Sequence, residues 1–115
     1  MAEHTLAHVG INGESEQEGL DTANWFADRF GFGVKLGNSS NFADTAVECC
    51  KKEFPGQHGH IGFSTLSPER AVAWFEAKGI PLREETRKVD AAGRLVSIYL
   101  KEEIGGFAVH IMKKK

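Results

Sequence analysis

This chain has few of the residues that mark several large classes of protein. Its two cysteines are the neighbours Cys49 and Cys50; adjacent strand residues point to opposite faces, so we expect no disulfide between them. No apolar run approaches the ~18 residues of a membrane-spanning helix, and no basic start followed by an apolar stretch indicates a signal peptide. The net charge is only -2, which argues against nucleic-acid and membrane-surface partners. We therefore expect a cytoplasmic protein that binds neither.

The length and composition are those of an ordinary soluble protein. The chain has 115 residues, of which 41% are hydrophobic and 26% charged, and this length predicts a single domain over residues 1–115. Each half, at roughly 57 residues, would be marginal alone. The two halves are therefore expected to fold as a unit.

A repeat is the most informative positive feature. The segment His-Val-Gly-Ile at residues 8–11 recurs as His-Ile-Gly-Phe at residues 60–63. Each copy is followed by a helix-like stretch that contains Trp-Phe, and then by a Gly between apolar residues. The same order twice in one chain predicts two copies of one small unit, which can enclose a cleft between them.

Hydrophobic periodicity gives each unit the order β-α-β-β-β. In the first unit we predict a strand over 5–12, a loop or first turn over 13–19, a helix over 20–30, and strands near 32–36, 40–43 and 45–51. In the second we predict a strand over 58–65, a helix from the capping Ser67 to the Gly79 stop, and strands near 81–87, 94–100 and 106–112. The predicted fold class is α+β: two tandem βαβββ modules, about 4–53 and 56–113, form an eight-stranded mixed sheet curved around a cleft.

Strand alternation then sorts side chains between the helix-covered face and the open face. Val47 is expected to face the core, as are the apolar residues Val96, Ile98, Leu100, Phe107, Val109 and Ile111. Four coordinating residues fall on the open face, two from each module: His8, Glu48, His60 and His110.

Three imidazoles and one carboxylate form a donor set for a divalent transition metal such as Zn, Ni, Mn, Co or Fe. Four protein ligands on an octahedral ion would leave two positions for both oxygens of a hydroxyketone, diol or 2-oxo acid. With one carboxylate the loaded site would keep about one positive charge, which favours an enolate or oxyanion. The alternative is that each histidine has no role in metal binding and is a surface or hydrogen-bonded strand residue.

Four further residues are candidates for substrate binding. Tyr99 and Cys50 are expected on the open face, where a hydroxyl could bind a substrate oxygen and a thiol could line the pocket. His58 shares the face of His60, and Arg94 could bind a carboxylate or phosphate. Each has a simpler structural reading, as a sheet residue, a buried thiol, a solvated strand end and an exposed loop arginine.

The sequence resembles the vicinal oxygen chelate superfamily, which includes glyoxalase I, methylmalonyl-CoA epimerase, extradiol dioxygenases, and fosfomycin and bleomycin resistance proteins. The paired His-Val/Ile-Gly-Ile/Phe strands, the Trp-Phe helices and the closing Gly-Phe-Ala-Val-His strand carry the resemblance, over roughly residues 5–112. More narrowly, residues 37–40, 58–60 and 99–107 look like a domain appended to some bacterial keto-deoxy-phosphogluconate/keto-hydroxyglutarate aldolases.

The resemblance implies a glyoxalase-like fold with metal ligands on the first and last strand of each module. Carried over, these ligands are His8, Glu48, His60 and His110, the set that the open face selects. One departure stands out: His110 occupies a place where family members often have a Glu that binds metal and transfers protons. The replacement puts glyoxalase I chemistry in doubt, although a His can also bind metal or move protons near neutral pH.

We therefore predict a small metal-dependent lyase or isomerase that binds a 2-oxo or hydroxy acid through two oxygens, with Glu48 and His110 as the catalytic candidates. One alternative is a non-catalytic binding module of the bleomycin-resistance type, or an accessory that serves a sugar-acid aldolase in trans. An extradiol-type dioxygenase ranks lower, because the short chain leaves little room for an aromatic pocket. A two-fold homodimer is the expected assembly.

Overall fold

The structure is a computed structural model that describes residues 3–52 and 54–114. The first half of the chain contains β1 (Thr5–Ile11), α1 (Glu16–Phe30), β2 (Val34–Lys35), β3 (Ser40–Ala43) and β4 (Val47–Cys50). The second half contains β5 (Gly59–Thr65), α2 (Pro68–Ala77), β6 (Leu82–Val89), β7 (Leu95–Ile104) and β8 (Phe107–Lys113). The predicted order β-α-β-β-β thus occurs twice.

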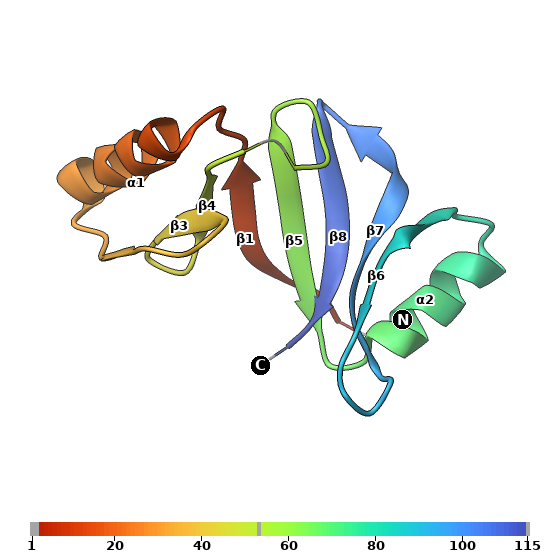
Figure 1. The fold of residues 1–115 in the computed structure, drawn as a ribbon. Coiled ribbons are helices and arrows are strands. Elements are labelled where there is room, and N and C mark those ends of the chain that lie inside the picture. Colours follow the sequence, from red (N-terminus) through yellow and green to blue (C-terminus); the bar gives the residue numbers. More distant parts are fainter. Residues whose placement is uncertain (1–2, 53, 115) are drawn as a thin grey trace.

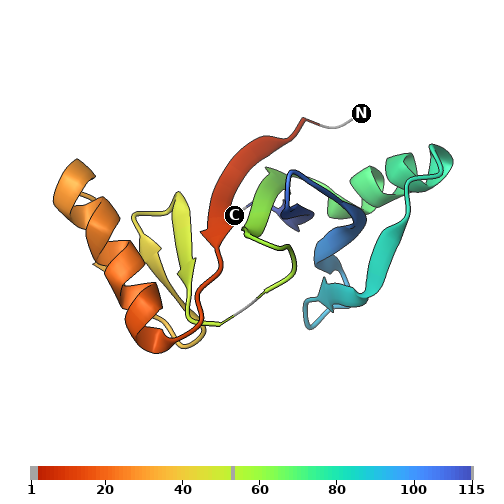
Figure 2. The same cartoon turned by 90° about the horizontal axis from the view of Figure 1, so that it is seen from above.

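All eight strands form one mixed sheet in the order β2-β3-β4-β1-β5-β8-β7-β6. The two first strands of the halves, β1 and β5, pair antiparallel at the centre, and each pairs in parallel with the last strand of its own half. The halves are therefore related by an approximate two-fold axis between β1 and β5. The helices lie at opposite ends of the sheet, α1 beside β2–β4 and α2 beside β6–β8 (Figures 1 and 2).

Local sequence explains where each helix begins and ends. The Ser15 hydroxyl oxygen accepts a 3.1 Å hydrogen bond from the Glu18 N–H. Acidic residues lie in the first turn of α1, where their negative charge interacts favourably with the helix dipole. Gly31 ends this helix with a left-handed φ of 71°. In α2, Ser67 caps the helix and Pro68 takes its first position. Helix α1 therefore begins at Glu16, so that of residues 13–19, predicted as loop or first turn, residues 16–19 belong to the helix and 13–15 precede it.

The core consists of two clusters, one beneath each helix. Under α1, Ala23, Ala43 and Cys49 are buried, and Val47 packs against them as predicted. Under α2, the buried residues are Ala71, Val72, Leu95, Ile98 and Ile111. Leu95 thus takes the core position that alternation predicted for Val96. The cause is a shift in the β6–β7 pairing next to Leu95, which an alternating pattern does not reveal.

No helix among the described residues is long and apolar enough to cross a membrane.

Candidate metal centre

The four central strands bring the predicted donor residues together. His8 lies on β1, Glu48 on β4, His60 on β5 and His110 on β8, and these strands are neighbours in the order β4-β1-β5-β8. The three histidines are buried, with exposed fractions of 9%, 2% and 8%. The cleft face of one chain therefore gathers a cluster to which both halves contribute two residues.

The three imidazoles of this cluster face one another through their Nε2 atoms. Nε2 of His8 lies 3.2 Å from Nε2 of His60 and 3.4 Å from Nε2 of His110. Oε1 of Glu48 lies 2.9 Å from Nε2 of His60 and 3.5 Å from Nε2 of His8. Hydrogen bonding alone satisfies this arrangement poorly, because a neutral imidazole Nε2 carries at most one hydrogen and His8 has two imidazole neighbours there.

A shared cation accounts for these distances better. Ligand nitrogens that sit ~2.0–2.1 Å from one ion at right or tetrahedral angles lie about 2.9–3.4 Å apart. The observed separations of 3.2 and 3.4 Å fall in this range. The donor atoms of His8, His60 and His110 all lie within 4.8 Å of one another. The chain's own residues thus fit a divalent transition metal.

The repeated glycines explain how three rings fit between paired strands. In the antiparallel β1–β5 register, Gly10 stands opposite His60 and Gly62 opposite His8. A Cβ at Gly10 would lie 2.0 Å from Cε1 of His60, and a Cβ at Gly62 would lie 2.6 Å from Nε2 of His110. Each His-x-Gly copy therefore supplies a ligand candidate and clears space for the imidazole of the other copy.

The environment gives His8, His110 and Glu48 the protonation states that metal binding requires. Burial lowers the pKa of His8, and burial together with His60 and His8 lowers the pKa of His110 to about 3. Burial acts to raise the pKa of Glu48, but hydrogen bonds from His60 and Ser40 outweigh it and lower this pKa to about 2. At neutral pH the site therefore offers neutral imidazoles at His8 and His110 and an ionised carboxylate at Glu48.

Two further side chains contact the candidate ligands and hold their orientation. Ser40 Oγ donates a 2.7 Å hydrogen bond to Oε2 of Glu48, which leaves Oε1 directed at the imidazoles. The Tyr99 ring stacks on His110 with centroids 4.7 Å apart and 15° between planes. Burial raises the pKa of Tyr99 to about 12, so its hydroxyl stays protonated. Ser40 was missed by the sequence reasoning, since only the β3–β4 register brings it to Glu48.

The other predicted site residues divide into two groups. Cys50 lies at the cluster, because its Sγ and the donor atoms of Glu48 and His60 are within 4.8 Å of one another. Burial and the Glu48 charge raise the pKa of Cys50 to about 12. The His58 ring packs on Phe107 at the β7–β8 turn, and Arg94 is exposed in the β6–β7 turn. Neither is brought to the imidazoles, and their roles in substrate binding stay predictions.

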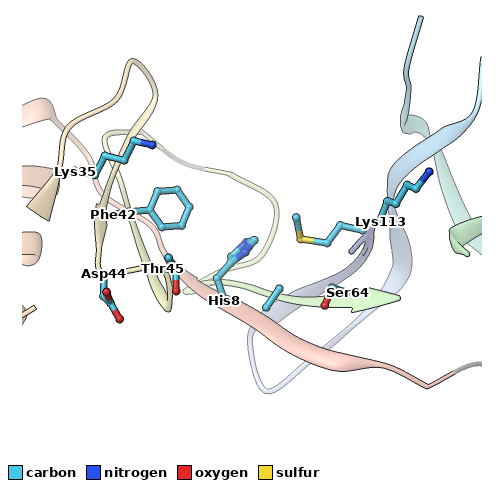
Figure 3. A pocket seen from close by; sticks show the side chains of 9 residues that line it. His8, Lys35, Phe42, Asp44, Thr45, Ser64 and Lys113 are labelled. Atoms are coloured by element: carbon cyan, nitrogen blue, oxygen red, sulfur yellow. The ribbon is translucent and has the colours of Figure 1, made fainter. Parts of the chain in front are cut away.

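A pocket of about 380 Å³ opens beside His8 (Figure 3). Its wall includes apolar side chains from both halves, Phe42 and Met112, as well as Thr45 and Ser64. Two ammonium groups, those of Lys35 and Lys113, lie on opposite sides of it, with Asp44 the one carboxylate in its lining. The pocket thus combines an apolar body with a predominantly cationic rim.

An open eight-stranded sheet built from two βαβββ halves defines the glyoxalase-like fold. Solved structures confirm this fold over nearly the whole chain. A variant of methylmalonyl-CoA epimerase from Streptomyces coelicolor, in complex with 2-nitronate-propionyl-CoA, is 13% identical and superposes with a TM-score of 0.62; the match covers 95% of this chain and 96% of that one. The hypothetical protein BH1468 from Bacillus halodurans C-125 is 16% identical, with a TM-score of 0.67 and coverage of 98% and 96%.

Methylmalonyl-CoA epimerase from Mycobacterium tuberculosis is 15% identical, with a TM-score of 0.60 and coverage of 96% and 87%. At the level of sequence, no protein-family model and no curated protein matches the chain. The comparisons therefore establish the fold and leave the activity to be argued from the site.

Proposed function

We propose that this protein is a metal-dependent lyase or isomerase of the vicinal oxygen chelate superfamily, acting on a small 2-oxo or hydroxy acid through two substrate oxygens. The observation that carries the proposal is the convergence of three imidazole nitrogens and one carboxylate oxygen at 2.9–3.5 Å in a buried cleft. The proposed ligands are His8, Glu48, His60 and His110, and the ion is Zn, Ni, Mn, Co or Fe in the divalent state.

A bound divalent cation would supply Lewis-acid stabilisation of negative charge that develops on the substrate oxygens. The residues of the chain would place and protonate the substrate. The Glu48 carboxylate is ionised and held by Ser40, and the neutral His110 ring is held by Tyr99. These two groups are our candidates for moving a proton to or from the carbon next to the substrate carbonyl.

The pocket beside His8 supports an acidic substrate. Lys35 and Lys113 lie on its two sides, and Thr45 and Ser64 add hydroxyl groups. A small acid could place its carboxylate near the ammonium groups while its carbonyl reaches the imidazoles. The apolar side chains of Phe42 and Met112 would pack against its carbon chain.

The similarity to methylmalonyl-CoA epimerase supports isomerase chemistry in particular. One such structure holds methylmalonyl-CoA itself, at 13% identity and a TM-score of 0.62. An epimerase exchanges a proton at carbon, and the present site has a carboxylate and an imidazole suited to that step. Acyl-CoA esters therefore belong beside 2-oxo and hydroxy acids in any screen. Homodimer formation and an aldolase partner in trans stay predictions, which size-exclusion chromatography and co-purification with such an aldolase would test.

Metal content is the first test. Elemental analysis of untagged protein should find about one transition metal per chain in the wild type and none in His8→Ala or His110→Ala. Cys49→Ala is a matched control, because Cys49 lies in the core beneath α1 and should leave metal content unchanged. Wild-type protein that takes up no Zn, Ni, Mn, Co or Fe(II) on incubation would contradict the proposal.

Proton exchange is the second test. The loaded protein, incubated in D₂O with small 2-oxo acids, hydroxy acids and acyl-CoA esters, should place deuterium at the carbon next to a carbonyl of its substrate. Glu48→Gln should slow this exchange by roughly 10²–10⁴-fold, the usual contribution of general acid–base catalysis. Ligand binding with no exchange in the wild type would favour a non-catalytic binding module instead.

A further inference from the structure

The cluster contains a second donor set, which differs from the proposed metal ligands by including the thiol of Cys50. It consists of Glu48, Cys50 and His60, whose carboxylate oxygen, Sγ and ring nitrogen lie within 4.8 Å of one another. The Cys50 thiol is buried, with 1% of its surface exposed, and it projects from β4 on the same face as Glu48. This set shares Glu48 and His60 with the four proposed ligands and adds Cys50.

A thiolate changes which cations a site prefers. Sulfur ligands select soft, polarisable ions, whereas imidazole and carboxylate ligands also serve harder ones. Ligands at ~2.0–2.3 Å from one ion lie roughly 3–4.5 Å apart, so the second set needs only a small adjustment of side chains. The three imidazoles and the Glu48–Cys50–His60 set are therefore two positions that suit different metals.

His60 is built to serve either position. Its ring is 2% exposed, and its Nδ1 has no hydrogen-bond partner among the described residues. A metal-ligating histidine usually has its second nitrogen fixed by a carboxylate, carbonyl or water. Without such a bond the His60 ring is held by packing and by its Nε2 contacts with His8 and Glu48, and it can shift between the two sets.

We propose that Cys50, with His60 and Glu48, binds thiophilic divalent cations such as Cd²⁺, in competition with the metal on His8, Glu48, His60 and His110. The competition rests on the proposed metal function, since both ions need Glu48 and His60. On binding, the S–H bond of Cys50 breaks as the sulfur–metal bond forms, the proton leaves to solvent, and no atom changes oxidation state. One chain then holds one ion at a time.

Absorption spectroscopy tests the two positions separately. Co²⁺ should give visible d–d bands from the imidazole set, and Cd²⁺ should give a near-ultraviolet sulfur-to-metal charge-transfer band. Cd²⁺ added to the Co²⁺ protein should raise the second signal as the first declines, with one Cd²⁺ displacing one Co²⁺. The charge-transfer band should be lost in Cys50→Ser and in His60→Ala.

Two control variants make the assignment specific. Cys49→Ala should keep the band, because Cys49 faces the core on the opposite side of β4. His8→Ala should keep it too, since His8 is absent from the thiol-containing set. X-ray absorption of the wild-type Cd²⁺ protein should show sulfur among the ligands, which keeps the test valid if Cys50→Ser fails to fold.

The outcomes separate this inference from the proposed function. Co²⁺ bands without a Cd²⁺ charge-transfer band would overturn the role of Cys50 and leave the imidazole site standing. Absence of both signals would overturn both proposals. Simultaneous binding of the two ions, with undiminished Co²⁺ bands, would overturn the sharing of Glu48 and His60.

Discussion

Replacing Gly62 by Ala should damage the proposed metal centre more than the fold. A Cβ at this position would lie 2.6 Å from Nε2 of His110 and 2.9 Å from Cε1 of His8. Optimal contacts between such atoms are about 3.5–4.0 Å, so both rings would have to retreat by roughly 0.6–1.4 Å. The His110 ring is stacked on Tyr99 and buried, which leaves it little room to retreat.

The magnitudes favour a clear effect. Overpacking of this kind costs about 1–3 kcal/mol, whereas removing a glycine from a strand interior by itself gains about 0.5–1 kcal/mol. The expected net loss in the free energy of unfolding is therefore about 1 kcal/mol and at most about 2.5 kcal/mol, from the difference of these two terms. Metal ligands tolerate errors of only about 0.2 Å, and weaker disturbances of ligand orientation already cost about 10–100-fold in affinity, so we expect at least that loss here.

Competition with a chelating dye would measure the metal affinity, and urea denaturation of the metal-free protein would measure the unfolding free energy. Gly33→Ala is the matched control, because a Cβ there has no atom within 4 Å and the glycine's φ is not left-handed. Wild-type affinity in Gly62→Ala would refute the argument that this glycine makes room for the imidazoles.

Three other expectations follow from the site. Tyr99→Phe should retain metal affinity while Tyr99→Leu lowers it severalfold, because the ring that stacks on His110 is kept in the first variant and lost in the second. The same dye competition would measure both affinities. Equal losses in the two variants would instead implicate the Tyr99 hydroxyl. Ser40→Ala should weaken metal binding by about tenfold, within the range for groups that orient ligands, and differential scanning calorimetry should show little change in Tm; an unchanged affinity would mean that Glu48 needs no support. Metal-free protein should lose stability as pH falls below about 6.5, because the unfolded chain protonates His110 near that pH while the folded chain, with a pKa of about 3, does not. Urea denaturation between pH 7 and pH 4 should therefore give a decline of a few kcal/mol at most, roughly 1.4 per pH unit, that is smaller in His110→Gln; identical declines in the two proteins would contradict this assignment.

Most of the fold was predictable because the sequence repeats its pattern. Alternation placed Val47 and Ile111 towards the core, and the structure confirms both. The apolar pattern placed the start of α1 only within residues 13–19, because Glu16 to Gly19 carry no apolar stripe. The capping hydroxyl of Ser15, with acids after it, was the signal that located this end. The shifted pairing beside Leu95 had no comparable signal.

The sequence predicted which residues are the candidate metal ligands better than it predicted how their side chains are arranged. Strand parity selected His8, Glu48, His60 and His110, and the structure brings all four together. Their environment depends on register, which one sequence does not specify. Three features were hidden for that reason: the hydrogen bond from Ser40, the stacking of Tyr99, and the space left by the glycines of the opposite copy.

The approximate two-fold axis between β1 and β5 has a consequence for how a ligand is held. It relates His8 to His60 and Gly10 to Gly62, and it also relates Glu48, which pairs with Gly10, to His110, which pairs with Gly62. A fully symmetric centre would accept a molecule with two oxygens equally well in either of two reversed orientations. An anion on one side of the axis and a neutral ring on the other make those orientations unequal in energy. The difference between the two copies at this pair of positions therefore makes the two binding orientations distinguishable, which is what selection between mirror-image substrates requires.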